Sequence, residues 1–247
     1  MRYFIRFSYN GKAYHGWQRQ PNAISVQQVL EEAMSKVLRN SIITMGAGRT
    51  DTGVHASEMV AHFDHDRELP IEVVFKLNSI LPNDIAVENI IEVEPQAHAR
   101  FDALDRTYKY RISTKKNVFN TDYAFYFYKL LNFKTMNEAC DLLFQYRDFQ
   151  CFSKSNTDVM TYNCTIKKAE WIKVGDEIIF TIKADRFLRN MVRAIVGTLL
   201  DIGLGKLNID DLHQIIKSKD RRKAGFSVPA HGLYLVNIEY PDDLGKR

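Results

Sequence analysis

The chain has 247 residues, and its hydrophobic fraction of 45% and charged fraction of 26% are typical of a soluble globular protein. No apolar run is long enough to cross a bilayer, and the alternating N-terminus lacks the apolar core of a signal peptide, so we expect a cytoplasmic protein without membrane contact. The net charge of +4 is compatible with a polyanionic partner but does not identify one. The odd number of cysteines and their spacing argue against disulfides and a zinc site, so Cys140, Cys151 and Cys164 are expected to be reduced packing residues.

The first half of the chain predicts the order strand, helix, strand, strand, helix, strand. Alternating apolar and polar residues over 2–9 predict a strand with one buried face. Ser25 and Gln28 form a capping box at the start of a helix whose apolar residues recur at helical spacing. The elements that follow are short apolar runs at 41–46 and 58–63, a helix that opens at Pro70, and a strand from Ile85 to Val93.

The second half repeats this pattern approximately, without detectable sequence identity to the first. Two ferredoxin-like split βαβ units explain the order, so the sequence predicts an α+β fold with helices on one face of a continuous, mostly antiparallel sheet. The predicted halves are residues 1–100 and 101–247, packed as one body. The elements of the second half are a strand at 103–113, a helix opened by Thr135 with Glu138 as its capping partner, strands at 166–174 and 178–184, helices at 187–202 and 208–218, and a strand at 232–240.

The segment from Gly46 to Ala56 is the most informative part of the sequence. It reads GAGRTDTGVHA, and its three glycines surround Arg49 and Asp51 between two strand-like runs. Glycine permits close approach by a ligand or another chain segment, and a carboxylate on such a loop is presented rather than buried. From the spacing alone, the favoured interpretation is a tight turn with an aspartate cap and a surface ion pair.

The stretch Gly48-Arg49-Thr50-Asp51-x-Gly53-Val54-His55-Ala56 resembles the catalytic signature of the tRNA pseudouridine synthase A family. Further motifs resemble that family in the same order over nearly the whole chain. Thr52 and Arg186 depart from the family's usual residues, and residues 150–165 match poorly and are assigned no role. The other matching motifs are Tyr9-Asn10-Gly11 with YHGWQRQ at 14–20, LNSILPNDI at 77–85, HARF at 98–101, RTYKY at 106–110, ADRFLRNMVR at 184–193 and PAHGLYL at 229–235.

The resemblance implies the pseudouridine synthase fold and a specific reaction. Members of that family isomerise uridine to pseudouridine at positions 38, 39 and 40 in the anticodon stem-loop of tRNA, so tRNA is the expected partner, and a homodimer is expected. The reaction breaks the C1′–N1 bond, turns the uracil and joins C5 to C1′. It needs no redox step or external energy, and the sequence lacks phosphate-loop and dinucleotide fingerprints, so no cofactor and no metal are expected.

The resemblance also assigns roles to six residues. Cleavage builds positive charge at C1′, where a carboxylate serves as nucleophile or stabiliser, so Asp51 either attacks C1′ or removes a proton from C2′. Arg193 is the expected cation that lowers the pKa of Asp51 and keeps it ionised. By resemblance, Arg49 holds the flipped nucleotide. The resemblance gives Tyr108 two roles, stacking on the uracil and help in removing the C5 proton, and stacking is favoured because a phenol with an ordinary pKa of about 10 is a reluctant base. The predicted helix at 187–202 places Arg193 on one polar side with two predicted phosphate contacts, Arg186 and Arg189.

Other aromatic and basic stretches have two interpretations. Tyr110 lies on the same predicted strand face as Tyr108 and suits the core. The loop residues Tyr14, His15, Trp17 and Arg19 mix rings and cations as RNA-binding loops do, and Lys217–Lys223 is suited to phosphates. For these loop and basic residues, a packing or solvated role is equally consistent with the sequence.

Three alternatives to this function follow from the residues. A metal-dependent phosphoesterase would use the cluster His55, His62, Asp64, His65 and Asp66, although no second ligand cluster follows downstream. A non-catalytic RNA-binding module explains the basic and aromatic residues but not Asp51 among its glycines. A pseudouridine synthase acting on another RNA site would keep the chemistry and change the target.

Overall fold

The computed structural model describes residues 1–155, 159–242 and 244, and the chain divides into two compact units. The first unit contains Met1–Asp105 and the C-terminal segment from Tyr234, and the second contains Arg106–Leu233. The C-terminal segment groups with the first unit because strand β9 (Leu233–Glu239) pairs in parallel with the start of β3 (His55–Asp64). Residues 101–105 and the segment from Tyr234 therefore do not group with the rest of the predicted second half.

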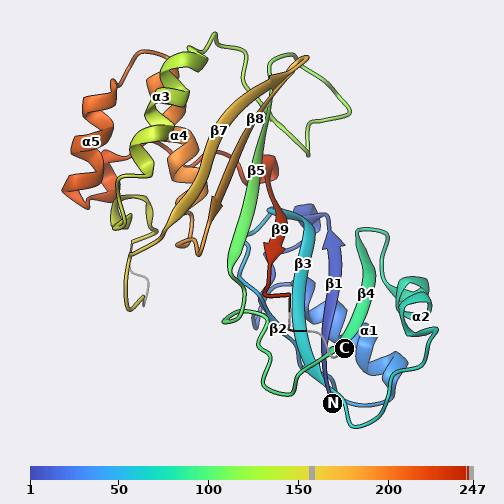
Figure 1. Ribbon diagram of the computed structural model, residues 1–247. Coiled ribbons are helices and arrows are strands. Elements are labelled where there is room, and N and C mark those ends of the chain that lie inside the picture. The colour runs from blue at the N-terminus through green and yellow to red at the C-terminus, as the bar shows by residue number, and fades with distance from the viewer. Residues whose placement is uncertain (156–158, 243, 245–247) are drawn as a thin grey trace. The chain divides into compact units, whose positions relative to one another are not determined.

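In the first unit, the sheet has the strand order β4-β1-β3-β9 (Figure 1). The central strand β1 (Arg2–Tyr9) runs antiparallel to β3 on one side and to β4 (Ile85–Val93) on the other. The short strand β2 (Met45–Gly46) pairs with the far end of β3. The predicted strands at 2–9 and 85–93 are confirmed at both ends. In β1 the consecutive residues Tyr3, Phe4 and Ile5 are all buried, so burial is not confined to the one face that the alternation predicted.

Two α-helices complete the first unit, α1 (Val26–Leu38) and α2 (Val73–Ile80), and they pack against each other. The side chain of Ser25 accepts a hydrogen bond from the backbone N–H of Gln28, as predicted for the start of α1. The side chain of Gln28 instead donates to Glu32, so the reciprocal bond of the capping box is not formed. A short 3-10 helix, η1 (Gly11–Ala13), follows β1.

The second unit has a sheet in the order β5-β8-β7, with β5 (Asp105–Ser113), β8 (Glu177–Ala184) and β7 (Ile166–Val174) all antiparallel to their neighbours. The short β6 (Phe125–Tyr126) pairs in parallel with the end of β5. Three α-helices gather on one side of β7 and β8 (Figure 1). They are α3 (Phe133–Leu143), α4 (Met191–Gly203) and α5 (Ile209–Ser218), and the 3-10 helices of this unit are η2 (Gln150–Phe152), η3 (Arg221–Lys223) and η4 (Ala230–Gly232).

Two predicted helix starts in this unit are wrong. Helix α3 is capped by Asn132, whose side-chain oxygen accepts from the N–H of Thr135, so the cap lies three residues before the predicted one. Helix α4 begins at Met191 and not at 187, because Asn190 adopts a left-handed conformation with φ 67° that no helix interior allows. Arg186 and Arg189 therefore precede the helix and do not share a helical face with Arg193.

The nine strands and five α-helices of the described residues confirm the predicted α+β class. All three cysteines are free and buried, which confirms that they pack in the interior without disulfides, and burial raises the pKa of each thiol to about 12. Within the described part of the chain, no helix combines the length and the apolar character that a membrane span requires.

Candidate catalytic site

Asp51 lies at the start of a tight turn in the loop that joins β2 to β3. The N–H of Val54 donates to the carbonyl oxygen of Asp51 at 3.1 Å, which closes a four-residue turn. Gly53, the third residue of this turn, has φ 77°, a value that favours glycine at this position. Asp51 is half-buried and Arg49 is exposed, so the loop presents a carboxylate and a guanidinium two residues apart. The predicted tight turn is confirmed.

The loop that follows β1 holds this turn at two points. The N–H of Gly53 donates to the carbonyl oxygen of Tyr14 at 3.3 Å, and the N–H of Trp17 donates to the carbonyl oxygen of Thr50 at 3.3 Å. These two bonds bracket Asp51 on either side. Because backbone groups make both bonds, they fix the path of the chain through Asp51 whatever its side chain does.

Close packing between the two loops explains two of the glycines. A Cβ on Gly16, which has φ 84°, would lie 2.2 Å from the carbonyl oxygen of Thr50, and a Cβ on Gly46 would lie 2.4 Å from Nε1 of Trp17. Tyr14 and Trp17 are buried, with 5% and 3% of their surface exposed. Burial supports the packing interpretation of these two aromatic rings and removes them from the surface available for stacking on RNA bases.

The histidine of the signature motif also has a structural setting. Nδ1 of His55 accepts a hydrogen bond of 3.0 Å from the N–H of Gly11, and its ring stacks on Tyr234 of β9 with centroids 4.7 Å apart. Since Nδ1 accepts, a neutral His55 carries its proton on Nε2. This residue links the Asp51 loop, the loop after β1 and the C-terminal strand.

The other members of the acidic and histidine cluster make structural contacts. Nδ1 of His62 accepts from the N–H of Ala99 at 3.1 Å, and both oxygens of Asp64 accept from Arg2 at 2.8 Å. In the ranges that the structure describes, no group of three or more His, Cys, Asp or Glu side chains is arranged to hold a metal ion. The cluster that suggested a phosphoesterase is therefore not assembled as a ligand set.

In the second unit, Tyr108 lies on β5 and faces the segment that leads into α4. Its ring meets the ring of Phe187 edge-on, with centroids 5.2 Å apart and planes at 86°. On the same strand face, Arg106 donates to the carbonyl oxygen of Asp185 at 2.8 Å. Tyr110 is fully buried and donates to the carbonyl oxygen of Pro229 at 2.9 Å, and burial raises its pKa. Tyr110 is thus the core tyrosine, as the sequence predicted.

The segment that carries Arg186 and Arg189 is a fixed loop. One carboxylate oxygen of Asp185 accepts from the N–H groups of Thr165 and Arg186, each at 2.7 Å. The carbonyl oxygen of Arg189 accepts from the N–H of Lys154 at 3.0 Å. Arg189 is exposed and Arg186 is half-buried, so a cation of this loop faces solvent as a phosphate contact requires.

Arg193 lies in the first turn of α4 and is bound to the loop before η4. Its Nε donates to the carbonyl oxygen of Val228 at 2.7 Å, and its own carbonyl oxygen accepts from the N–H of Val228 at 3.3 Å. These contacts fix the direction of the guanidinium within the second unit. Arg49 and Asp51 belong to the first unit, whereas Tyr108, Arg186, Arg189 and Arg193 belong to the second.

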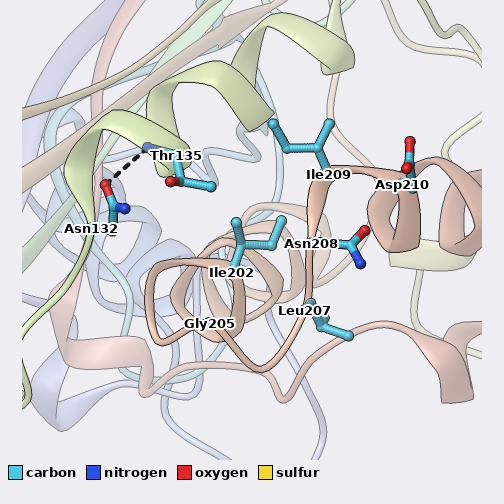
Figure 2. A pocket seen from close by; sticks show the side chains of 8 residues that line it. All are labelled: Asn132, Thr135, Ile202, Gly205, Leu207, Asn208, Ile209 and Asp210. Atoms are coloured by element: carbon cyan, nitrogen blue, oxygen red, sulfur yellow. Dashed lines mark hydrogen bonds between the residues drawn. The ribbon is translucent and has the colours of Figure 1, made fainter.

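A pocket of about 430 Å³ in the second unit lies at the ends of three helices and contains none of the predicted site residues (Figure 2). Figure 2 shows the amide oxygen of Asn132 bonded to the backbone of Thr135, and Asn208 caps α5 in the same way through Asp211. The side-chain oxygens of Asn132 and Asn208 are therefore occupied in capping.

Sequence reasoning missed three residues that organise the site. Phe187 touches Tyr108, Asp185 fixes the loop before α4, and Asp84 accepts a hydrogen bond from the hydroxyl of Tyr14. All three lie inside matching motifs, so the signal was present. Their roles depend on partners distant in sequence, which no local pattern indicates.

Comparison with known proteins agrees with this geometry. The family model described as tRNA pseudouridine synthase matches residues 6–102 and 139–241. The second range includes residues 150–165, to which the sequence assigned no role, and the stretch 103–138, which contains Tyr108, lies outside both ranges. The match covers most of the chain, including Asp51 and Arg193.

Individual relatives extend the similarity over nearly the full length. A tRNA pseudouridine synthase A of Parabacteroides distasonis is 55% identical over 98% of this chain and 97% of its own length. One of Bacteroides thetaiotaomicron is 54% identical over 98% and 92%, and one of Thermoanaerobacter pseudethanolicus is 44% identical over 96% and 98%. The chain therefore belongs to the tRNA pseudouridine synthase family. It is an isomerase that converts uridine to pseudouridine in tRNA.

Proposed function

We propose that this isomerase modifies uridines 38, 39 and 40 in the anticodon stem-loop of tRNA, with Asp51 as its catalytic carboxylate. The observation that supports Asp51 is the turn that presents it, closed on itself and hydrogen-bonded on both sides to the loop after β1. A half-buried carboxylate on such a fixed turn meets the requirement that a reacting group be held in place before the substrate arrives. The support for the target site is the similarity to relatives named tRNA pseudouridine synthase A.

The chemistry needs an ionised carboxylate next to the ribose. Asp51 either attacks C1′ as the C1′–N1 bond breaks, or removes the C2′ proton to give a glycal. In both routes the freed uracil turns and C5 bonds to C1′, either as the Asp51–C1′ bond breaks and frees the carboxylate or as C2′ of the glycal regains its proton from Asp51, and the proton on C5 then passes to water. The uracil nitrogen that left C1′ ends as an N–H group, so atoms and electrons balance without a cofactor.

The remaining residues are proposed to bind and orient the flipped nucleotide. Tyr108, which is only 9% exposed in the free protein, is proposed to stack on the uracil, and Arg49 fills or holds the space left in the stem. Arg193, whose Nε donates to the carbonyl oxygen of Val228, is proposed to supply positive charge to the substrate-bound site. Arg186 and Arg189 contact phosphates from the loop before α4.

The proposed setting is a cytoplasmic homodimer that binds tRNA. The net charge of +4 and the exposed cation of Arg189 support binding of a polyanion. The dimer rests on the resemblance to the family, and the cytoplasmic location on the sequence pattern described above.

The test uses unmodified tRNA carrying tritium at uridine C5, incubated with the protein in excess EDTA. Tritium released to water reports loss of the C5 proton, and mapping of pseudouridine along the product locates the modified positions. Asp51→Ala is the test variant. Asp66→Ala is the matched control, because Asp66 is an exposed aspartate near the end of β3 and belongs to the cluster that suggested a metal site.

The expected result is release by the wild type and by Asp66→Ala, with a loss of about 10³-fold or more in Asp51→Ala. Pseudouridine at 38, 39 and 40 would support the proposed target. Pseudouridine only at other positions would support the alternative that the enzyme modifies another RNA site. Activity that EDTA abolishes would favour the metal-dependent alternative. Undiminished release by Asp51→Ala would remove Asp51 from the mechanism.

A further inference from the structure

One aspartate, Asp84, which lies just before β4, bonds to the loop after β1 at two points. Its side-chain Oδ1 accepts a hydrogen bond of 2.6 Å from the hydroxyl of Tyr14. Its carbonyl oxygen accepts a hydrogen bond of 2.8 Å from the N–H of Asn10. The two ends of segment 10–14, which contains η1, are therefore held by one residue 70 positions further along the chain than Tyr14.

The same segment makes a direct contact with the turn that carries Asp51. The carbonyl oxygen of Tyr14 accepts from the N–H of Gly53, two residues after Asp51. Gly16, two residues after Tyr14, packs so closely on Thr50 that any side chain would collide with its carbonyl oxygen. A displacement of Tyr14 is thus transmitted to both sides of Asp51.

We propose that Tyr14 is a positioning residue for Asp51 and acts through its hydrogen bond to Asp84. The proposal rests on the role of Asp51 given under Proposed function. Tyr14 does not touch the reacting atoms in this role, because its hydroxyl is occupied by Asp84 and its surface is 5% exposed. Its contribution is to hold the backbone of the Asp51 turn where the ribose is attacked.

The strength of this anchor suits a positioning role. A phenol that donates to a carboxylate at 2.6 Å makes a short, charge-assisted hydrogen bond. Burial, followed by the bond to Asp84, raises the pKa of Tyr14, so the phenol stays protonated and donates throughout the working pH range. A catalytic group displaced by about 1 Å loses on the order of 10²-fold in rate, so a small relaxation of this loop is measurable.

The test compares Tyr14→Phe with Tyr240→Phe in the full-length protein. Tyr240 is the matched control, because it also lies in the first unit and donates an equally short hydrogen bond of 2.6 Å, to the carbonyl oxygen of Ala99. Tritium release from C5-labelled tRNA gives kcat and KM, and thermal unfolding gives the stability of each variant. Asp84→Asn keeps a side-chain oxygen that can accept from Tyr14, and Asp84→Ala removes it.

We expect Tyr14→Phe and Asp84→Ala to lower kcat about 10- to 100-fold with KM within about twofold of the wild type. Tyr240→Phe is expected to have the kcat of the wild type. Asp84→Asn is expected to have a kcat much closer to that of the wild type than Asp84→Ala has. Equal kcat losses in Tyr14→Phe and Tyr240→Phe, or no loss in Tyr14→Phe, would overturn the positioning role. In that case an inactive Asp51→Ala would leave the proposed function standing, whereas an inactive wild type would count against the proposed function itself.

Discussion

The hydroxyl groups of Tyr9 and Thr50 lie 2.8 Å apart in the interior of the first unit, one residue before Asp51. Tyr9 is the last residue of β1, where the register against β3 shifts between Phe7 and Tyr9. The irregular end of a central strand is thereby bonded to the loop that carries the proposed catalytic carboxylate. Bulges next to functional sites re-aim side chains in this way.

This contact predicts the behaviour of Thr50 variants. Thr50→Val keeps the shape and removes the hydroxyl, so we expect the free energy of unfolding to fall by about 1 to 2 kcal/mol. Thr50→Ser keeps the hydroxyl, so its free energy of unfolding should fall less than that of Thr50→Val. Urea unfolding of both variants, and of Tyr9→Phe with Thr50→Val in a double-mutant cycle, measures the coupling. Strict additivity in the cycle would show that the two hydroxyl groups do not interact.

Alanine substitutions at three glycines distinguish the cost of backbone strain from the cost of a steric collision. Gly16→Ala combines a positive φ with a collision on Thr50, Gly175→Ala has φ 60° with open space around the new Cβ, and Gly48→Ala has neither. We expect losses in the free energy of unfolding of about 3 kcal/mol or more for Gly16→Ala, about 1 kcal/mol for Gly175→Ala, and less than about 0.5 kcal/mol for Gly48→Ala. Chemical denaturation gives all three values. A Gly16→Ala variant as stable as Gly175→Ala would contradict the close packing of the two loops.

His62 makes the first unit sensitive to acid. Burial lowers the pKa of His62 to about 4, with further lowering by His98 and Arg2, whereas Asp64 and Asp102 oppose the shift. An unfolded histidine has a pKa near 6.5, so between about pH 6.5 and 4 the unfolded chain binds a proton that the folded chain excludes. The contribution of His62 to the free energy of unfolding is therefore fully present above about pH 6.5 and is lost progressively as the pH falls toward 4.

The expected loss across this window is about 1 to 2 kcal/mol, after allowance for solvent around the site. His62→Asn keeps an acceptor for the N–H of Ala99 but does not titrate, so its free energy of unfolding should depend less on pH. The exposed His15→Asn is the control and should follow the wild type. Urea unfolding from pH 7.5 to 4.5 measures the difference. Parallel curves for the wild type and His62→Asn would exclude His62 as the source.

Arg189 is expected to act through phosphate charge and not through base recognition. Arg189→Ala should weaken tRNA binding at low salt and reduce the slope of log affinity against log salt by about 1. Lys134→Ala removes the same charge from an exposed side chain on α3 and is the control. Filter binding over a salt series measures both. A lower affinity with an unchanged slope would mean that Arg189 does not neutralise a phosphate.

Much of the fold was predictable from local patterns. Strands 2–9, 85–93 and 166–174 were predicted with their observed ends, because alternation with bounding turns has few alternative structures. The start of α4 was not predicted correctly. The apolar spacing from Phe187 onward is typical of a helix, whereas the left-handed Asn190 prevents the helix from beginning before Met191. Asparagine tolerates the left-handed conformation but does not require it, so the sequence alone left the helix start open.

The sequence by itself determined the chemistry-bearing motif around Asp51, the α+β class and the family. The α+β class follows from the order of the predicted elements, whereas the motif and the family follow from the resemblance of this chain's motifs to a known family. Only the tertiary structure decided that Tyr14 and Trp17 are buried supports of the Asp51 turn, and that His62 and Asp64 have structural partners. The reason is physical. Burial and hydrogen-bond partners are set by residues far apart in sequence, such as Tyr14 and Asp84, and the packing that joins them is not encoded in either local pattern.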